Sequence, residues 1–353
     1  MTAYYSQCIP GTASSTTAAG GTTTTKSSAP TSTGTGKLPT SFKWSSSDAL
    51  ISPKVDSHNV LAIKDPSIVN YNGVYHVFAS IVTSGGYSIV YLNFTDFSQA
   101  HNANQFYLQN SAIGSGYRAA PQIFFFAPQN LWYLVFQDGN VGYSTNPNIS
   151  NPAGWSAVQN FYSSTPSIIS SNIGSGNWVD MWVICDSANC HLFSSDDNGH
   201  LYRAETSLSN FPHGFGQPVI AMSSPSNIYA LFEASNVYNY GSGYLLIVEA
   251  IGSDGHRYFR SWTSSSLTGT WAELADTESN PFARSTNVVF PENPGWTQDI
   301  SHGEMIRSGH DQTLTIDPCN LKYLYQGDAP GSYSDYNSIP WRLALLTQTN
   351  SAC

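Results

Sequence analysis

The sequence predicts an all-β protein, and within that class a five-bladed β-propeller. Between residues 37 and 353, no long stretch carries apolar side chains at the i, i+3, i+4 spacing of a helix, and short β-branched and aromatic runs alternate instead with clusters of Gly, Asn, Ser and Pro. Five strand–turn–strand units start 56, 59, 52 and 70 residues apart. A four-stranded propeller blade takes about 40–50 residues or more, so five blades fill this region. A β-sandwich or jelly roll is the alternative, and the even spacing disfavours it.

The five units follow one another along the chain. They are residues 65–80, 121–137, 180–195, 232–250 and 302–318, the last followed by a strand at 321–327. In the first unit, Asn72-Gly73 marks a tight hairpin turn, because both residues tolerate the positive φ that such turns need. After the third unit, Asp196-Asp197-Asn198-Gly199 begins like a calcium-binding loop, but Ser207 stands where that loop needs a Glu. We therefore predict a hairpin turn there.

The first 36 residues differ from the rest. Fifteen of the 26 residues from 11 to 36 are Ser or Thr, and such a segment buries too little apolar surface to offset its ordering entropy. We expect a disordered Ser/Thr-rich linker of the kind that carries O-linked glycans. Residues 1–10 are either the remnant of a cellulose-binding module, whose last strand Tyr4–Cys8 resembles, or an arbitrary tail. Residues 37–353 form the propeller domain.

Composition narrows the class of ligand. Only 36 residues are charged, against 47 aromatic ones, and the net charge is −10. Nucleic-acid binders need a basic face, and anionic membranes attract basic segments, so neither is an expected partner. No stretch approaches the ~18 apolar residues of a membrane span. A surface rich in neutral polar groups favours a neutral polar ligand such as a carbohydrate, and we expect a monomer.

The cysteines indicate an oxidising compartment. The chain has five, none in a CxxC pair, so a structural zinc site is not expected. In a secreted protein, Cys185–Cys190 would clip a short hairpin and Cys319–Cys353 would tie down the C-terminus. Cys8 is left over. The first ten residues lack the basic and apolar regions of a signal peptide, so we expect the chain to be the mature form, or a trimmed piece, of a secreted, extracellular protein.

Three carboxylates lie within apolar or aromatic surroundings at the start of repeat units: Asp65, Asp180 and Glu233. Residues at equivalent positions on the inner strands of a propeller gather at one end of its axis. Two such carboxyls supply the acid and the base of glycosidic bond cleavage, and a third raises the pKa of the acid by charge repulsion. The alternative is structural, because a buried Asp or Glu often accepts backbone hydrogen bonds or caps a turn.

Several motifs in order then carry a family resemblance. They are Phe42-Lys43-Trp44-Ser45-Ser46, Lys64-Asp65-Pro66-Ser67, the run from Trp178 to Asp186, Leu231-Phe232-Glu233-Ala234, Ser301-His302-Gly303-Glu304 and Asp317-Pro318-Cys319. Essentially all of residues 37–353 resembles the fungal α-L-arabinofuranosidases of glycoside hydrolase family 62. The resemblance implies a five-bladed propeller that removes arabinofuranosyl side groups from xylan with inversion, so that arabinoxylan or its oligosaccharides would be the partner.

The resemblance also implies roles for individual residues. Asp65 would be the general base, Glu233 the general acid, and Asp180 the group that tunes and orients the acid. An inverting enzyme holds its acid and base about 6.5–9.5 Å apart, leaving room for a water. His302 would ligate a calcium ion in the channel. Calcium prefers about 6–8 oxygen ligands, so waters would have to complete its shell, and the alternative is a hydrogen-bonded channel histidine.

Five further residues are candidates for binding substrate. Lys64 would hold a sugar hydroxyl and keep the neighbouring base ionised, or be an ordinary surface lysine. Arg260 would reach the pocket or pack on strand aromatics. Trp44 would stack on a sugar ring or pack in the core. The resemblance suggests that Tyr336 and Asn337 line the cleft in which a xylan backbone passes.

Two rival functions remain open at this stage. A related five-bladed glycosidase, such as a β-xylosidase or an endo-arabinanase, would use the same carboxylates. A noncatalytic carbohydrate-binding propeller would have no need of three carboxylates at matching inner-strand positions.

Overall fold

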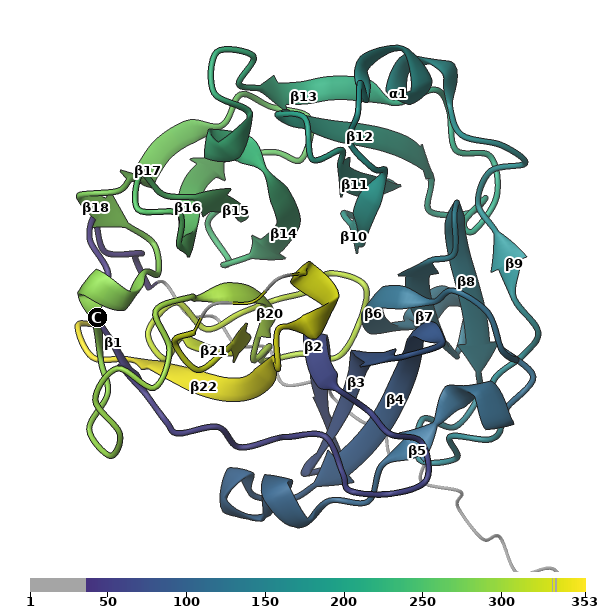
Figure 1. Cartoon of the computed structure of the whole chain (residues 1–353). Coiled ribbons are helices and arrows are strands. Elements are labelled where there is room, and N and C mark those ends of the chain that lie inside the picture. Colours follow the sequence, from purple (N-terminus) through teal and green to yellow (C-terminus); the bar gives the residue numbers. More distant parts are fainter. Residues whose placement is uncertain (1–35, 332, 334) are drawn as a thin grey trace, which may run out of the picture. The chain divides into compact units, whose positions relative to one another are not determined.

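The computed structural model describes residues 36–331, 333 and 335–353. The predicted N-terminal remnant or tail, the linker residues 11–35 and Cys8 lie outside the described residues. Five β-sheets are arranged around a common centre (Figure 1), which confirms the predicted five-bladed propeller. In the described part of the chain, no helix has the length and apolar character needed to cross a membrane.

Each of the first three blades is a four-stranded antiparallel meander. Blade 1 consists of β2 (Ala62–Tyr71), β3 (Val74–Thr83), β4 (Gly86–Phe94) and β5 (Phe106–Tyr107). Blade 2 consists of β6 (Ala119–Phe126), β7 (Leu131–Gln137), β8 (Val141–Asn146) and β9 (Gln159–Asn160). Blade 3 consists of β10 (Val179–Cys185), β11 (Asn189–Ser195), β12 (His200–Ser207) and β13 (Val219–Ser223).

The last two blades have five strands each. Blade 4 consists of β14 (Glu233–Asn239), β15 (Tyr244–Ile251), β16 (Arg257–Ser264), β17 (Ala272–Thr277) and β18 (Asn280–Pro281). Blade 5 consists of β20 (Ser301–Met305), β21 (Lys322–Gly327), β22 (Arg342–Gln348), β1 (Trp44–Ser46) and β19 (Val288–Val289).

Helices are short and lie between strands. The α-helix α1 spans Ser167–Asn172, and 3-10 turns span Phe97–Asn102, Leu108–Asn110, Ala127–Gln129, Ile228–Leu231, Ser285–Asn287 and Tyr336–Ser338.

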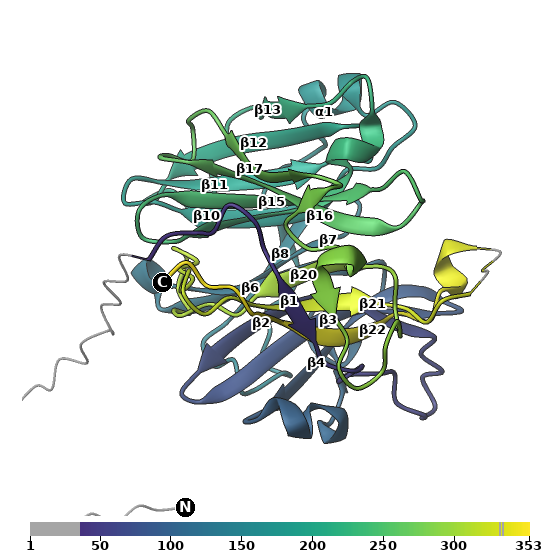
Figure 2. The ribbon, with the colours of Figure 1, turned by 90° about the vertical axis from the view of Figure 1, so that its left-hand side faces the viewer.

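The N-terminal strand closes the ring. β1 pairs antiparallel with β22, so the start of the domain completes the blade formed by its end (Figures 1 and 2). Trp44 anchors this strand: it is fully buried, its indole donates to the Phe282 carbonyl at 2.6 Å, and its ring packs on Phe42 and Phe282. Burying an aromatic of this size removes a large apolar surface from water. The closure therefore joins the two ends of the domain without a covalent bond.

All five inner strands carry a β-bulge near their first residue. The ladder register shifts just after Lys64, Ala119, Val179, Glu233 and Ser301. In four blades the residue that follows has a left-handed φ: 48° at Asp65, 48° at Ala120, 58° at Asp180 and 51° at Ala234. A bulge bends its strand and redirects side chains. The five bulges thus mark one end of the propeller axis.

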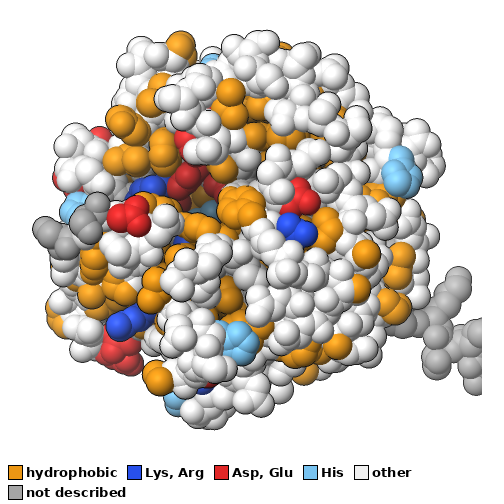
Figure 3. All heavy atoms as spheres, turned by 45° about the vertical axis from the view of Figure 1, so that its right-hand side comes forward, with side chains coloured by type: hydrophobic (Ala, Val, Ile, Leu, Met, Phe, Trp, Pro, Cys, Tyr) orange, Lys and Arg blue, Asp and Glu red, His pale blue; other side chains and the backbone are white. Residues whose placement is uncertain are grey.

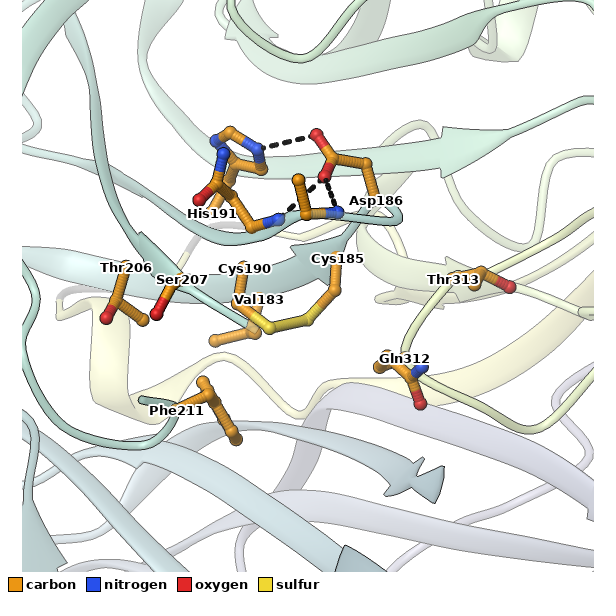
Figure 4. The surroundings of a disulfide bond; sticks show 12 residues. Val183, Cys185, Asp186, Cys190, His191, Thr206, Ser207, Phe211, Gln312 and Thr313 are labelled. Atoms are coloured by element: carbon orange, nitrogen blue, oxygen red, sulfur yellow. Dashed lines mark hydrogen bonds and ion pairs between the residues drawn. A yellow bond between two sulfur atoms is a disulfide. The ribbon is translucent and has the colours of Figure 1, made fainter. Parts of the chain in front are cut away.

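Both predicted disulfides are confirmed. Cys185–Cys190 links β10 to β11 across their hairpin, where Asp186 accepts hydrogen bonds from the hairpin backbone and lies 3.1 Å from His191 (Figure 4). Cys319–Cys353 holds the C-terminal residue against the segment before β21. Residues 196–199 form the turn between β11 and β12, as predicted.

Candidate active site

A pocket of about 540 Å³ opens where the bulged strands begin. It is lined by side chains from several blades, among them Lys64, Asp65, Tyr87, Tyr117, Gln137, Trp178, Asp180, Asp197, Glu233, His302 and Tyr336. On the face in Figure 3, acidic and basic side chains cluster among hydrophobic ones, while most of the surface is uncharged. Five charged side chains, Lys64, Asp65, Asp180, Asp197 and Glu233, line this one pocket in a chain that has only 36.

Asp65 and Asp180 approach each other from blades 1 and 3. Both are bulge residues and both are buried. His302, the corresponding residue of blade 5, places Nδ1 3.5 Å from Asp65 Oδ1 and 3.7 Å from Asp180 Oδ1. Residues 115 apart in the sequence thus lie around one imidazole.

Glu233 reaches the same pocket from a different strand position. In the ladder, it corresponds to Lys64, the last residue before the bulge, whereas Asp65 and Asp180 correspond to Ala234. The expectation that all three carboxylates occupy equivalent positions is corrected here by one residue. The bulge explains this, because it lets two consecutive residues of one strand contribute to the pocket.

Lys64 faces the pocket and is buried. Its ammonium lies 3.5 Å from Asp65 Oδ1, donates to the Tyr336 hydroxyl at 2.8 Å, and stands over the rings of Tyr336 and Tyr87 at 4.6 and 5.4 Å. Burial by itself lowers the pKa of Lys64, but the charge of Asp65 and the two tyrosines outweigh burial and raise it well above its usual range. The lysine therefore stays charged and pairs with the Asp65 carboxylate.

Arg257, which sequence reasoning passed over, bridges two carboxylates. Its Nη1 donates to Glu233 and, at 2.5 Å, to Glu249 Oε1, which lies across the ladder on β15. The guanidinium also stands over the rings of Phe232 and Tyr336 at 5.0 and 5.7 Å. A signal was present in the sequence: Glu249 interrupts an apolar strand, and a buried carboxylate needs a counterion.

The pKa values of Glu233, which Arg257 contacts, and of Asp180 are shifted in opposite directions. Burial raises the pKa of Glu233, but Arg257 and then Lys64 outweigh burial and lower it. The pKa of Asp180 is raised well above its usual range, first by burial and then by the charges of Glu233 and Asp65. Without a ligand, Asp180 is therefore the carboxyl that holds a proton more readily.

A fourth carboxyl, Asp197, belongs to the pocket although its turn was assigned only a structural role. Asn177 donates to Asp197 Oδ2 at 3.2 Å, and Oδ1 is buried without a hydrogen-bond partner among the described residues. Burial, followed by the charges of Glu233 and Asp180, raises the pKa of Asp197 to about 8. Because β11 runs antiparallel to β10 and ends opposite Val179, the turn that follows β11 lies at the pocket end of the blade.

Comparison with known proteins identifies the family. The family model described as Glycosyl hydrolase family 62 matches residues 43–347. The chain belongs to glycosyl hydrolase family 62. It is 44% identical over 315 residues to alpha-L-arabinofuranosidase C of Cellvibrio japonicus, covering 88% of this chain and 48% of that protein, so it spans about half the length of this relative.

Two solved family 62 structures are similar along most of the chain. The catalytic domain of the Coprinopsis cinerea GH62 alpha-L-arabinofuranosidase is 64% identical with a TM-score of 0.88, covering 90% of this chain and 100% of that one. The Podospora anserina alpha-L-arabinofuranosidase, solved with cellotriose, is 56% identical with a TM-score of 0.87, covering 90% and 99%. Another GH62 hydrolase, 54% identical over 88% of this chain and 98% of that one with a TM-score of 0.85, was solved with xylotriose.

Of the five residues of this family 62 chain that were predicted to bind substrate, two line the pocket, one lies beside it and two lie elsewhere. Lys64 and Tyr336 line the pocket. Asn337 accepts from the Tyr87 hydroxyl at 2.6 Å and lines an adjoining hollow. Trp44 is fully buried in the closure, which corrects the expectation of sugar stacking. The expectation that Arg260 reaches the pocket is also wrong.

Arg260 lies outside the pocket. It stands 4.8 Å over the Trp262 ring, donates to the Ala230 carbonyl at 2.5 Å and pairs with Asp276 at 3.3 Å. Residues three apart on a strand point to opposite faces, and Arg257, not Arg260, contacts Glu233 and Tyr336 of the pocket lining. Strand parity alone shows that the two arginines point to opposite faces, but not which of them meets the pocket.

His302 is not surrounded by the many oxygen ligands that a calcium ion prefers. Among the described residues, no group of three or more His, Cys, Asp or Glu is placed to hold a metal ion. The side chains near its Nδ1 offer one imidazole nitrogen and single oxygens of Asp65 and Asp180, fewer oxygens than the roughly six to eight that calcium prefers. The protein donors alone do not fit calcium.

Proposed function

We propose that this family 62 protein is a secreted α-L-arabinofuranosidase that hydrolyses terminal α-L-arabinofuranosyl side groups of arabinoxylan with inversion. The observation that carries the proposal is the pocket in which Asp65, Asp180 and Glu233 meet on a sparsely charged domain. The activity is supported by similarity to proteins named as alpha-L-arabinofuranosidases, and the xylotriose bound to another relative supports a xylan-based substrate. Two disulfides fit an extracellular location.

In this proposal Asp65 is the general base. The Lys64 ammonium lies 3.5 Å from its carboxylate and holds it in position. Asp65 takes a proton from the attacking water while the water oxygen bonds to the anomeric carbon. Attack from the face opposite the leaving group inverts the configuration, so the α-linked sugar leaves as the β-anomer.

Glu233 is the proposed general acid, which gives its proton to the departing xylan oxygen. In the open pocket, Arg257 keeps the pKa of Glu233 low. Because burial is the largest influence on this carboxyl and acts to raise its pKa, a sugar that excludes water from the pocket favours the protonated form. Asp180, whose Oδ2 accepts from the backbone amide after Glu233 at 2.7 Å, orients the acid, and it tunes the pKa of the acid by charge repulsion when it is itself ionised.

The decisive experiment follows the anomeric proton by NMR during early hydrolysis of wheat arabinoxylan. We expect β-L-arabinofuranose first, and only a small residual release by Asp65→Asn or Glu233→Gln. Early α-anomer would refute inversion, and undiminished release by both variants would refute the roles. Binding without any release by the wild type would instead indicate a noncatalytic carbohydrate-binding propeller.

Calcium and the monomeric state remain part of the proposal. His302 would hold a channel calcium with water supplying most ligands, which metal analysis of the purified protein tests. Size-exclusion chromatography with light scattering tests whether the chain is a monomer.

A further inference from the structure

A ring of five polar side chains surrounds the bulges, one on the second strand of each blade. Each member lies directly across the ladder from the last inner-strand residue before the bulge. The members of this acceptor ring, all buried, are Ser80, Gln137, Ser195, Glu249 and Gln326.

Four members accept the backbone N–H of a bulge residue in the next blade. The bonds are Ala120 to Ser80 at 2.7 Å, Asp180 to Gln137 at 3.0 Å, His302 to Glu249 at 2.7 Å and Asp65 to Gln326 at 2.6 Å. A bulge removes its amide from the strand ladder, and a buried amide needs a partner. The acceptor ring supplies that partner.

For two of these residues the bond carries extra weight. Asp65 and Asp180 have φ of 48° and 58°. This left-handed backbone conformation is unfavourable for residues other than glycine. Gln326 and Gln137 hold these backbones in place with amide bonds from the neighbouring blade. The direction of each carboxyl toward the axis therefore depends on a glutamine of the neighbouring blade; Gln326 is not among the residues that line the pocket, whereas Gln137 also lines it.

The fifth member departs from the pattern. Ser195 Oγ is buried and has no hydrogen-bond partner among the described residues. The bulge amide it would serve, that of Ala234, donates instead to Asp180 Oδ2 at 2.7 Å. Asp180 is thus held at its own amide by Gln137 and at its carboxylate by the backbone beside Glu233.

Gln326 also links the proposed base to the proposed acid through a series of hydrogen bonds. Its Nε2 donates to Ser301 Oγ at 3.0 Å, and Ser301 donates to Glu249 at 3.1 Å. Glu249 accepts from Arg257 at 2.5 Å, and Arg257 also contacts Glu233. A continuous buried chain of hydrogen bonds therefore runs from the Asp65 amide to the Glu233 carboxylate.

We propose that Gln326 and Gln137 are positioning residues for hydrolysis: each fixes the bulge of the neighbouring blade and so sets the direction of Asp65 and Asp180. This inference rests on the proposed roles of the two aspartates. It predicts that losing either glutamine slows the chemical step more than it weakens substrate binding.

The quasi-symmetry of the acceptor ring offers a matched control. Ser80→Ala breaks the same kind of bond, but the amide it serves belongs to Ala120, which brings no carboxyl to the pocket. Gln326→Met and Gln137→Met keep the length of the side chain and remove its acceptor. All three variants lose one inter-blade hydrogen bond and are compared for thermal unfolding and for kcat and KM on arabinoxylan oligosaccharides.

We expect kcat to fall about 10–100-fold for each Met variant, since misplacing a reacting group by about 1 Å costs up to 10²-fold. KM should stay within about twofold for Gln326→Met, because Gln326 does not line the pocket. Ser80→Ala should lose a comparable amount of thermal stability and keep kcat within about twofold of the wild type. Wild-type kcat in both folded Met variants would overturn the inference, as would an equal loss of kcat in Ser80→Ala.

A double variant separates positioning from general damage. Combined with Asp65→Asn, Gln326→Met should cost little further activity, because residues that act as a unit are not additive. Full additivity would overturn the positioning role of Gln326. If Asp65→Asn alone keeps wild-type activity, the proposed function fails, whereas an inactive Asp65→Asn beside a fully active Gln326→Met refutes only the present inference.

Discussion

Replacing Arg257 with Met should destabilise the protein in a pH-dependent way. Arg257 is the shared counterion of Glu233 and Glu249, which face each other across β14 and β15. Removing one partner of a buried ion pair costs about 3–5 kcal/mol, because the remaining charge is left uncompensated. With an unfolding entropy of about 2.1 cal/mol/K per residue over roughly 320 residues, this corresponds to a fall in Tm of about 4–8 °C.

The pH dependence follows from the sign of the pKa changes. In the wild type, Arg257 lowers the pKa of Glu233. Burial raises the pKa of Glu249 to about 7 even with Arg257 present. Without Arg257, burial and mutual repulsion raise the pKa of Glu233 above its unfolded value and raise that of Glu249 further. A group whose folded pKa is raised loses stability as pH rises toward that pKa, so the Tm difference from the wild type should be larger at pH 8 than at pH 5.

The assay is thermal unfolding of wild type and variant at both pH values, with arabinose release measured in parallel. Arg260→Met is the control, because Arg260 lies on the same strand, pairs with Asp276 at 3.3 Å and does not line the pocket. We expect its Tm loss to be nearly the same at pH 5 and pH 8. An Arg257→Met loss that is equal at the two pH values, or smaller than that of Arg260→Met, would refute the reasoning.

Three further predictions use the same measurements. The raised pKa of Asp197, about 8, means that the wild type loses stability as pH rises from about 4 to about 8; Asp197→Asn should remove this loss and gain Tm relative to the wild type at pH 8 but not at pH 5. The stabilisation by a disulfide grows with the length of the loop it closes. In denaturant unfolding, removing Cys319–Cys353, which closes a separation of 34 residues, should lower the free energy of unfolding by about 4 kcal/mol. Removing Cys185–Cys190, which closes a separation of 5 residues, should lower it by about 2 kcal/mol. Treatment with a calcium chelator should lower Tm and be reversed by added calcium; an unchanged Tm, together with no calcium in the purified protein, would remove the ion from the proposal.

Much of the site could be predicted from local sequence. The inner strands begin within three residues of the predicted unit starts, because turn residues and apolar runs are local signals. Asp65, Asp180 and Glu233 stood out because a carboxylate among apolar residues is rare. Both disulfides followed from spacing and compartment.

The corrected or missed residues depend on contacts that no local pattern contains. The sequence around Trp44 does not show whether its side chain is buried or faces a ligand. The pairing of β1 with β22 buries it completely. Arg257 and Arg260 share one strand, and only the orientation of β16 in blade 4 shows which one meets Glu233. Asp197 reads as a turn residue until the turn is seen at the rim of the pocket.

The sequence by itself determined the repeat, the number of blades and the carboxylates available for chemistry, since period, turn composition and burial of rare charges are properties of short segments. Only the tertiary structure decided how those carboxylates are aimed and charged. Bulge amides find their acceptors in the neighbouring blade, and Arg257 reaches Glu233 across the strands of its own blade. Hydrogen bonds and ion pairs between residues far apart in the chain depend on distance in space, which the order of residues alone does not specify.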